Sequence, residues 1–372
     1  MASVTAPERA SQSGRRLLAL TSLRAFAALA VFTRHASETF FKIGDHSSLT
    51  RQGASGVSFF FILSGFVLAW SWRQADTPGR FYRRRFARIY PAYIVMLVAT
   101  QVAIGARHGF PLVPFLFNAA LLQSWVPQAK VFFTSGMGAW SLGCEAFFYL
   151  LFPLLLPLVG RASSRRRWQM LGLVAVVDLA VALTTHSPNQ SSGIGLWLVY
   201  VLPLTRVGEF LVGIVLATAV KEGMRSRITL NQALVVALVA YALAGVIPVY
   251  LMWEVFTLVP FSLLVLTAAS WESEGKATWL AKGWLVRLGE WSYAFYLVHI
   301  SVLAVIHHVF PQEGGAEGLG LTAISLVLAV AAAFCLFHVI ERPFERRLRG
   351  DAAIGEAAAR LSPLRPPIRH GR

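Results

Sequence analysis

The chain has 372 residues, of which 56% are hydrophobic and only 14% carry a formal charge. A soluble domain of this size would have about a quarter charged residues, so the composition excludes a soluble globular protein and indicates a polytopic membrane protein. The net charge is +16. Such a basic excess is typical either of nucleic-acid binding or of the cytoplasmic loops of a membrane protein, and the positions of the charges decide between the two.

Apolar runs of about 20 residues, the length that crosses a bilayer, recur along the chain. The first is followed by no small-residue cleavage pattern, so we interpret it as a retained span rather than a signal peptide. The ten predicted spans lie near 17–37, 54–70, 90–105, 140–159, 169–185, 197–220, 230–247, 249–270, 289–310 and 319–340. A further apolar stretch, 111–125, is short and contains two prolines.

Lysine and arginine are distributed unevenly between the two sides of this topology. With the amino terminus inside, the inner segments contain 27 of the 34 basic residues and the outer segments contain four. Cytoplasmic loops are enriched in Lys and Arg, so both termini are predicted to be cytoplasmic. If 111–125 crossed the membrane, one of the arginine-rich segments, RASSRRRW or FYRRRFAR, would lie on the outer side. That would go against the charge bias, so we predict that this stretch does not span. Topology accounts for the basic excess, and nucleic acid is not expected as a partner.

The predicted fold is an all-α transmembrane bundle of about ten spans in a single domain, residues 17–348. The flanking segments, 1–16 and 349–372, are predicted to be disordered cytoplasmic tails. The two cysteines, Cys144 and Cys335, lie in apolar runs and indicate neither a disulfide framework nor a metal site.

The first predicted span contains Arg24 and ends near His35. The two residues are eleven positions apart, which is three helical turns, so their side chains project from one face about 16 Å apart along the axis. An arginine at the centre of a membrane helix costs roughly 2.5–3.5 kcal/mol, so such residues point into the protein or a water-filled cavity. The structural alternative is a polar pair that holds helices together.

Other ionisable residues also fall within predicted spans. Glu145 lies near the start of the fourth span, at its outer end, and because the first span runs outward, His35 is expected at the same level. Arg206 and Glu209 have the spacing of a helical ion pair, and we interpret them as structural. His299, in WSYAFYLVHI of the ninth span, is more typical of packing than of chemistry.

The inner segment FYRRRFARIYP places Arg85 and Arg88 one helical turn apart. An arginine cluster before a span is a topology anchor. The functional alternative is binding of an anionic ligand, because guanidinium groups bind phosphate bidentately.

Six stretches, taken in order, resemble the integral-membrane acyltransferase 3 family, which acylates hydroxyls of bacterial surface sugars and of some secondary metabolites. They are LTSLRAFAALAVFTRH, GVSFFFILSGF, FYRRRFARIYP, WSLGCEAFFYLLFP, RVGEFLVG and WSYAFYLVH. The first also resembles macrolide acyltransferases of high-GC bacteria. The resemblance implies a multi-pass protein of the bacterial inner membrane.

The resemblance also implies site residues. The arginine and histidine of the family's first helix match Arg24 and His35, its cytoplasmic Arg-x-x-Arg pair matches Arg85 and Arg88, and its glutamate after Trp-Ser-Leu matches Glu145. One departure is that Cys144 precedes Glu145, where the family's motif often has two acidic or polar residues.

The co-substrate implied by the family is acyl-CoA, with acetyl-CoA as the default, and no metal is implied. Its phosphates would dock on Arg85 and Arg88, and a hydroxylated sugar acceptor would meet the acyl group near His35. His35 would act as general base with Glu145 orienting it, while Arg24 contacts donor phosphate or polarises a carbonyl. Direct transfer and a histidine-bound acyl intermediate both fit.

Two other function classes fit a polytopic chain with buried charges. A transporter or flippase of a lipid-linked or polysaccharide precursor would use the same charges along a permeation path. A scaffold for a polysaccharide-synthesis complex would not need His35 and Glu145 at one level. Membrane lipid is a partner under every interpretation, and the sequence indicates no oligomeric state.

Overall fold

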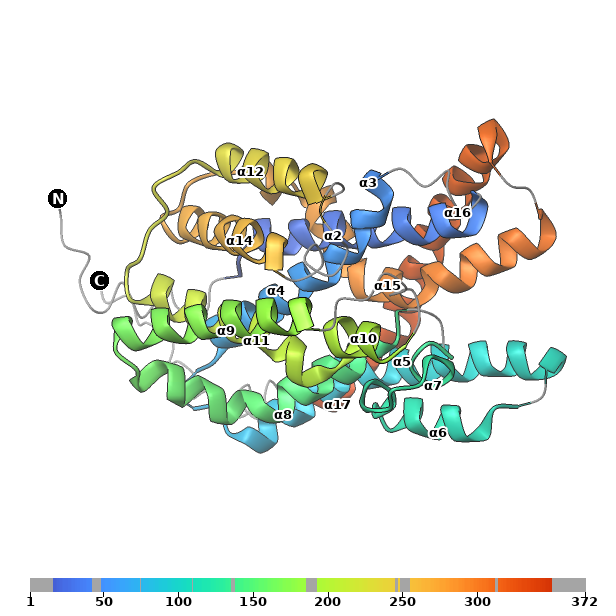
Figure 1. Cartoon of the computed structure of the whole chain (residues 1–372), viewed down its shortest axis with the longest axis horizontal. Helices are drawn as coiled ribbons and strands as arrows, with labels where there is room; N and C mark the ends of the chain where they lie inside the picture. Colours follow the sequence, from blue (N-terminus) through green and yellow to red (C-terminus); the bar gives the residue numbers. More distant parts are fainter. Residues whose placement is uncertain are drawn as a thin grey trace, which may run out of the picture.

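The computed structural model describes residues 16–41, 48–73, 75–108, 110–134, 138–184, 193–244, 247, 255–311 and 314–349. Within these ranges all regular secondary structure is helical, which confirms the predicted all-α class (Figure 1). Apart from Arg16 and Arg349, the predicted tails lie outside the described residues.

The long helices are α2 (Leu18–Phe40), α4 (Ser55–Ser71), α5 (Pro78–His108), α8 (Trp140–Arg161), α9 (Ser164–Thr184), α11 (Pro203–Lys221), α15 (Gly283–Val309) and α16 (Gly315–Leu336). Shorter helices are α3 (Ser48–Arg51), α6 (Leu112–Ala119), α7 (Ala129–Phe132), α10 (Ile194–Leu196), α12 (Leu230–Leu243), α14 (Thr257–Ser273) and α17 (Arg342–Arg349).

Seven helical segments of the described chain are long and apolar enough to cross a membrane. They are Gln52–Ser71, Pro78–Ala103, Trp140–Arg161, Ser164–Thr184, Ile194–Lys221, Gly283–Val309 and Gly315–Leu348. Helix α2 has 23 residues but carries Arg24, Arg34 and Glu38. Helices α12 and α14 have only 14 and 17 residues. The protein is therefore a multi-pass helical membrane protein, while the ten-span count and the sides of the termini stay predictions.

The stretch 111–125 does not form a spanning helix. Its helix α6 has eight residues, about 12 Å of rise, against a hydrocarbon core of about 30 Å. The side-chain amide of the buried Asn118 donates to the carbonyls of Pro114 (2.9 Å) and Val131 (3.0 Å), which ties α6 to α7. In Figure 1 α8 starts near the middle of the molecule, beyond α6 and α7, and runs toward the left end.

Small residues let the central helices approach one another closely. A Cβ atom on Gly65 of α4 would lie 2.0 Å from the carbonyl oxygen of Phe210 on α11, and one on Gly213 would lie 2.0 Å from that of Ile62. A Cβ on Gly289 of α15 would lie 1.9 Å from the carbonyl oxygen of Thr21 on α2. These contacts fix the spacing of α2, α4, α11 and α15, the helices at the centre of the bundle.

The amino end of α2 is held by a carboxylate of α14. The backbone N–H groups of Leu18 and Ala19 donate to the two oxygens of Glu272, at 3.0 and 2.9 Å. The first N–H groups of a helix have no partner within the helix, and the helix dipole favours negative charge there. Glu272 therefore anchors α2 at the end that leads to Arg24.

Replacing Gly65 with alanine should destabilise the bundle, because the added methyl group meets backbone that cannot move without separating α4 from α11. Overpacking of this kind costs roughly 1–3 kcal/mol. Thermal unfolding of the detergent-solubilised protein should show a lower Tm.

The matched control is Gly172→Ala, in the middle of α9, where a Cβ atom would meet nothing within 4 Å. It should leave the Tm unchanged or raise it, since alanine is the better helix former. Equal Tm values for the two variants would contradict the close approach of α4 and α11.

Candidate active site

A polar cavity of about 60 Å³ lies among helices α2, α4, α5, α8 and α15. Its lining combines three arginines, a glutamate and three hydroxyl side chains with apolar residues: Arg24, Arg85, Arg88, Glu145, Ser64, Tyr149, Tyr293, Phe60, Leu63, Val67, Leu68 and Ile89. Of the five residues predicted to form the site, four line this cavity. The remaining one, His35, is not part of its lining.

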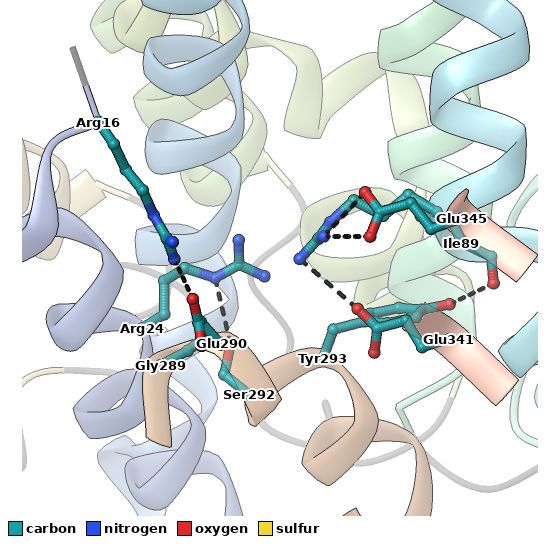
Figure 2. A network of polar contacts seen from close by, with 10 residues as sticks. Arg16, Arg24, Ile89, Gly289, Glu290, Ser292, Tyr293, Glu341 and Glu345 are labelled. Atoms are coloured by element: carbon teal, nitrogen blue, oxygen red, sulfur yellow. Dashed lines mark hydrogen bonds and ion pairs between the residues drawn. The ribbon is translucent and has the colours of Figure 1, made fainter. Parts of the chain in front are cut away.

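Arg24 reaches the cavity from α2 and is fixed by α15. Its Nε donates to the hydroxyl oxygen of Ser292 (3.1 Å), and this hydroxyl donates in turn to the carbonyl of Gly289 (2.8 Å). Figure 2 shows the two terminal nitrogens of Arg24 extending away from Ser292. The side chain is therefore held at its Nε, while its charged end faces the cavity.

Arg88 of α5 lies against two carboxylates from the end of the chain. Its Nη1 lies 3.2 Å from both carboxylate oxygens of Glu345, and its Nη2 lies 3.6 Å from Glu341, whose side chain is fully buried (Figure 2). Glu341 ends the π-helical turn η7 (Phe337–Glu341), and Glu345 belongs to α17. The sequence analysis did not identify this acidic pair, although the spacing in ERPFERRLR places both carboxylates on one helical face.

Arg85, one turn before Arg88, also lines the cavity. Its guanidinium carbon lies 5.8 Å from the centre of the Phe81 ring, a cation–π distance. Both members of the predicted arginine pair thus line the cavity, and carboxylates compensate the charge of Arg88 within the fold.

Glu145 lies within the arginine cavity rather than beside His35. Its carboxylate accepts hydrogen bonds from Tyr149 (2.8 Å), one turn further along α8, and from Ser64 of α4 (3.2 Å). The expectation that Glu145 orients His35 is therefore not met by the geometry. The physical reason is that Glu145 shares its cavity with Arg24, and His35 lies three helical turns, about 16 Å, further along α2.

His35 instead contacts a second histidine. Its Nδ1 lies 2.9 Å from Nε2 of His299, and His299 is completely buried. Nδ1 of His299 lies 2.8 Å from the carbonyl oxygen of Tyr296 and 3.2 Å from that of Phe295. His299, interpreted from the sequence as a packing residue, is therefore the direct partner of the predicted base.

The direction of α2 and α15 explains why the two histidines meet. Thr21 approaches Gly289, Arg24 binds Ser292 and His35 binds His299, so residue numbers rise together along both helices. Between the last two contacts α2 advances by eleven residues and α15 by seven, so the spacing along the two helices is unequal. The predicted spans containing His35 and His299 run in the same direction, but His35 lies near the end of its span and His299 in the middle, so no shared level was predicted.

The buried pair of Arg206 and Glu209 is structural, as predicted. Arg206 lies 3.0 Å from Glu209, both side chains are at most 1% exposed, and Arg206 also donates to the hydroxyl of Ser58 (3.0 Å). A buried charge needs such compensation to be tolerated.

A bundle of apolar helices around an internal, charged cavity defines a multi-pass membrane protein with its polar site inside the fold. The acyltransferase 3 family, described as an acyltransferase domain, matches residues 17–338, and the chain belongs to this family. It is therefore an acyltransferase that transfers groups other than aminoacyl groups.

Named relatives cover most of the chain. Acyltransferase MdmB of Streptomyces mycarofaciens is 37% identical over 90% of this chain and 92% of its own length. Exopolysaccharide production protein ExoZ of Rhizobium meliloti is 29% identical over 88% and 99%. O-acetyltransferase OatA of Staphylococcus aureus is 23% identical over 90% of this chain but only 58% of its own, longer chain. No solved structure matched.

Arg88→Ala should destabilise the fold, because it leaves the buried carboxylate of Glu341 without its positive partner. Removing one member of a buried pair costs roughly 3–5 kcal/mol, and the double variant Arg88→Ala/Glu341→Gln should recover part of the loss. Both effects should be visible as shifts in Tm of the purified protein.

Arg80→Ala is the matched control on the same helix, because Arg80 lies exposed at its start. Surface substitutions usually change the free energy of unfolding by no more than about 0.5 kcal/mol, so its Tm should change little. A wild-type Tm for Arg88→Ala would show that the carboxylates do not depend on Arg88.

Proposed function

We propose that the protein is a membrane O-acyltransferase that moves an acyl group, with acetyl as the default, from acyl-CoA to a hydroxyl of a glycan, glycolipid or glycosylated metabolite. The observation that carries this proposal is the arrangement along α2, where Arg24 faces an arginine-lined cavity and His35 lies three turns further on. The printed names of the relatives, an acyltransferase and an O-acetyltransferase, support the same chemistry.

The cavity supplies the binding chemistry that an acyl-CoA donor requires. Guanidinium groups bind phosphate with two parallel hydrogen bonds, and Arg85 and Arg24 both face the cavity. We assign the donor phosphates to the arginines of this cavity, Arg24, Arg85 and Arg88. Arg88 also contacts Glu341 and Glu345, which support the cavity wall.

The distance along α2 favours a donor-binding role for Arg24 over a role at the carbonyl. Three helical turns, about 16 Å, separate Arg24 from His35, which is more than an arginine side chain spans. A thioester placed at His35 is therefore out of reach of Arg24. The elongated arm of acyl-CoA would bridge the two places, with its phosphates near Arg24 and its acyl group near His35.

The chemical step needs one base. Nε2 of His35 takes the proton of the acceptor hydroxyl while the hydroxyl oxygen attacks the thioester carbonyl carbon. The carbon–sulfur bond then breaks, and the departing thiolate receives the proton from the His35 imidazolium, which yields free CoA thiol and the acylated acceptor. Histidine suits both transfers because its ordinary pKa lies near neutral pH.

Glu145 contributes to the donor cavity in this scheme. Its negative charge lies among Arg24, Arg85 and Arg88, which would otherwise repel one another, and Tyr149 and Ser64 hold the carboxylate in place. We propose that it orients the arginines rather than the base. The protein would work in the bacterial inner membrane, with acyl-CoA arriving from the cytoplasm.

His35→Ala should abolish acyl transfer while leaving acyl-CoA binding nearly intact, because the histidine acts on the acceptor hydroxyl. The measurement is release of free thiol from acetyl-CoA by the purified protein in the presence of a sugar-bearing acceptor such as a glycosylated macrolide, with acetyl-CoA binding measured separately. Thiol release that persists in His35→Ala would refute the role of His35 as general base. A wild-type protein that moves sugar precursors across vesicle membranes without releasing thiol would instead indicate a flippase.

Arg85→Ala should weaken acetyl-CoA binding roughly tenfold or more, since a charged hydrogen bond contributes about 1.5–3 kcal/mol. The loss should be larger at low salt, where electrostatic attraction is least screened. Arg80→Ala is the control, because Arg80 lies exposed at the start of the same helix and outside the cavity lining. Equal losses in the two variants would show that the cavity does not bind the donor phosphates.

A further inference from the structure

The two hydrogen bonds made by His299 determine which of its ring nitrogens carries a proton. Nδ1 faces the carbonyl oxygens of Tyr296 and Phe295. A carbonyl oxygen only accepts hydrogen bonds, so Nδ1 of His299 must be the N–H donor. In a neutral imidazole the other nitrogen, Nε2, is then an acceptor.

The surroundings of His299 favour this neutral form. The side chain is fully buried, and its ring packs between aromatic groups, with the Phe295 ring 5.8 Å away and nearly parallel, and the Phe32 ring at 6.4 Å. Its hydrogen-bond partners in the described part of the chain are two carbonyls and His35, none of them a carboxylate. A buried charge without an opposite charge is costly, so a neutral ring is the stable state.

The proton state of His35 follows from that of its partner. Nε2 of His299 accepts, so Nδ1 of His35, 2.9 Å away, must donate. The ring centroids are 5.2 Å apart and the planes differ by 24°, so the rings meet edge to edge, with the N–H directed at its acceptor. The lone pair of His35 is thereby left on Nε2. This nitrogen has no hydrogen-bond partner among the described residues. The His35 side chain is also only partly buried.

We propose that His299 is a positioning residue that holds His35 in its Nδ1–H form, so that Nε2 is the nitrogen available to take a proton from the acceptor. This inference rests on the proposed role of His35 as base. When Nε2 takes the proton, the bond from Nδ1–H of His35 to His299 becomes charge-assisted and strengthens, which stabilises the imidazolium. A neutral histidine thus performs the orienting part that a carboxylate performs in a Ser-His-Asp triad.

The surrounding fold also holds this series of hydrogen bonds in place, from the Tyr296 carbonyl through His299 to His35. The carbonyl belongs to the backbone of α15, and the phenol of Tyr296 is itself held by Gly138 (2.9 Å) and Ser141 (2.9 Å). Such supporting hydrogen bonds behind a working histidine are what set its tautomer and ring orientation.

The direct test is the tautomer of His35 in the full-length protein without any substrate. Ring ¹⁵N chemical shifts of histidine-labelled protein report which nitrogen carries the proton, and the His35 signals are assigned by their loss in His35→Ala. The expected result is Nδ1–H in the wild type. His299→Phe keeps an aromatic ring but removes the acceptor, and should move the His35 proton to Nε2. His299→Gln offers an amide oxygen as acceptor and should keep Nδ1–H.

The second readout is the kinetics of thiol release from acetyl-CoA with the sugar-bearing acceptor. His299→Phe should lower kcat roughly 10- to 100-fold, the usual effect of losing a supporting partner, with the KM for acetyl-CoA unchanged. His299→Gln should restore most of kcat, which a role in packing alone would not predict, since phenylalanine fills the site at least as well.

The two proposals fail in different ways. A proton on Nε2 of His35 in the wild type, or an Nδ1–H form that survives in His299→Phe, would overturn the positioning role. Thiol release that persists in His35→Ala would overturn the base itself, whichever tautomer the spectra report.

Discussion

A charge or polar group buried in an apolar bundle must be compensated by another polar group, and the interior of this protein is organised by that constraint. Three ionisable side chains of the interior meet a partner on a different helix or turn: Arg88 meets Glu341, Arg24 meets Ser292 and His35 meets His299. These contacts fix which faces of α2, α5 and α15 turn inward. The same side chains that cost free energy in a membrane thereby specify how its helices pack.

The close approach of the helices makes these contacts possible. Gly289 lets α15 lie directly against α2 near the amino ends of the two helices, which run in parallel. Ser292 then reaches Arg24, and His299 reaches His35. A glycine with no chemistry of its own therefore determines which side chains can act together.

The site is divided along α2 rather than gathered at one point. Its cationic end is built from α2, α5 and α8, and its histidine end from α2 and α15. Such a separation suits a long ligand with an anionic head and a reactive tail, because each end of the ligand is recognised where its chemistry requires.

The sequence by itself determined the class of fold and most residues of the site. Hydropathy predicted a multi-pass helical protein because apolar runs of about 20 residues cross a bilayer as helices, whose backbone groups are all hydrogen-bonded internally. The cost of burying Arg24 predicted that its face of α2 turns inward. Residue spacing identified the structural pair of Arg206 and Glu209, because both members lie on one helix. Local periodicity carries information of this kind, since it depends on a single helix at a time.

Only the tertiary structure decided which of those residues meet. Helix α8 places Glu145 in the arginine cavity, α17 and the turn before it supply the carboxylates beside Arg88, and the pairing of α2 with α15 gives His35 its partner. Each of these outcomes depends on the depth and rotation of two helices relative to one another. Hydropathy fixes neither quantity, because it records how long and how apolar a helix is but not which neighbour its polar face contacts.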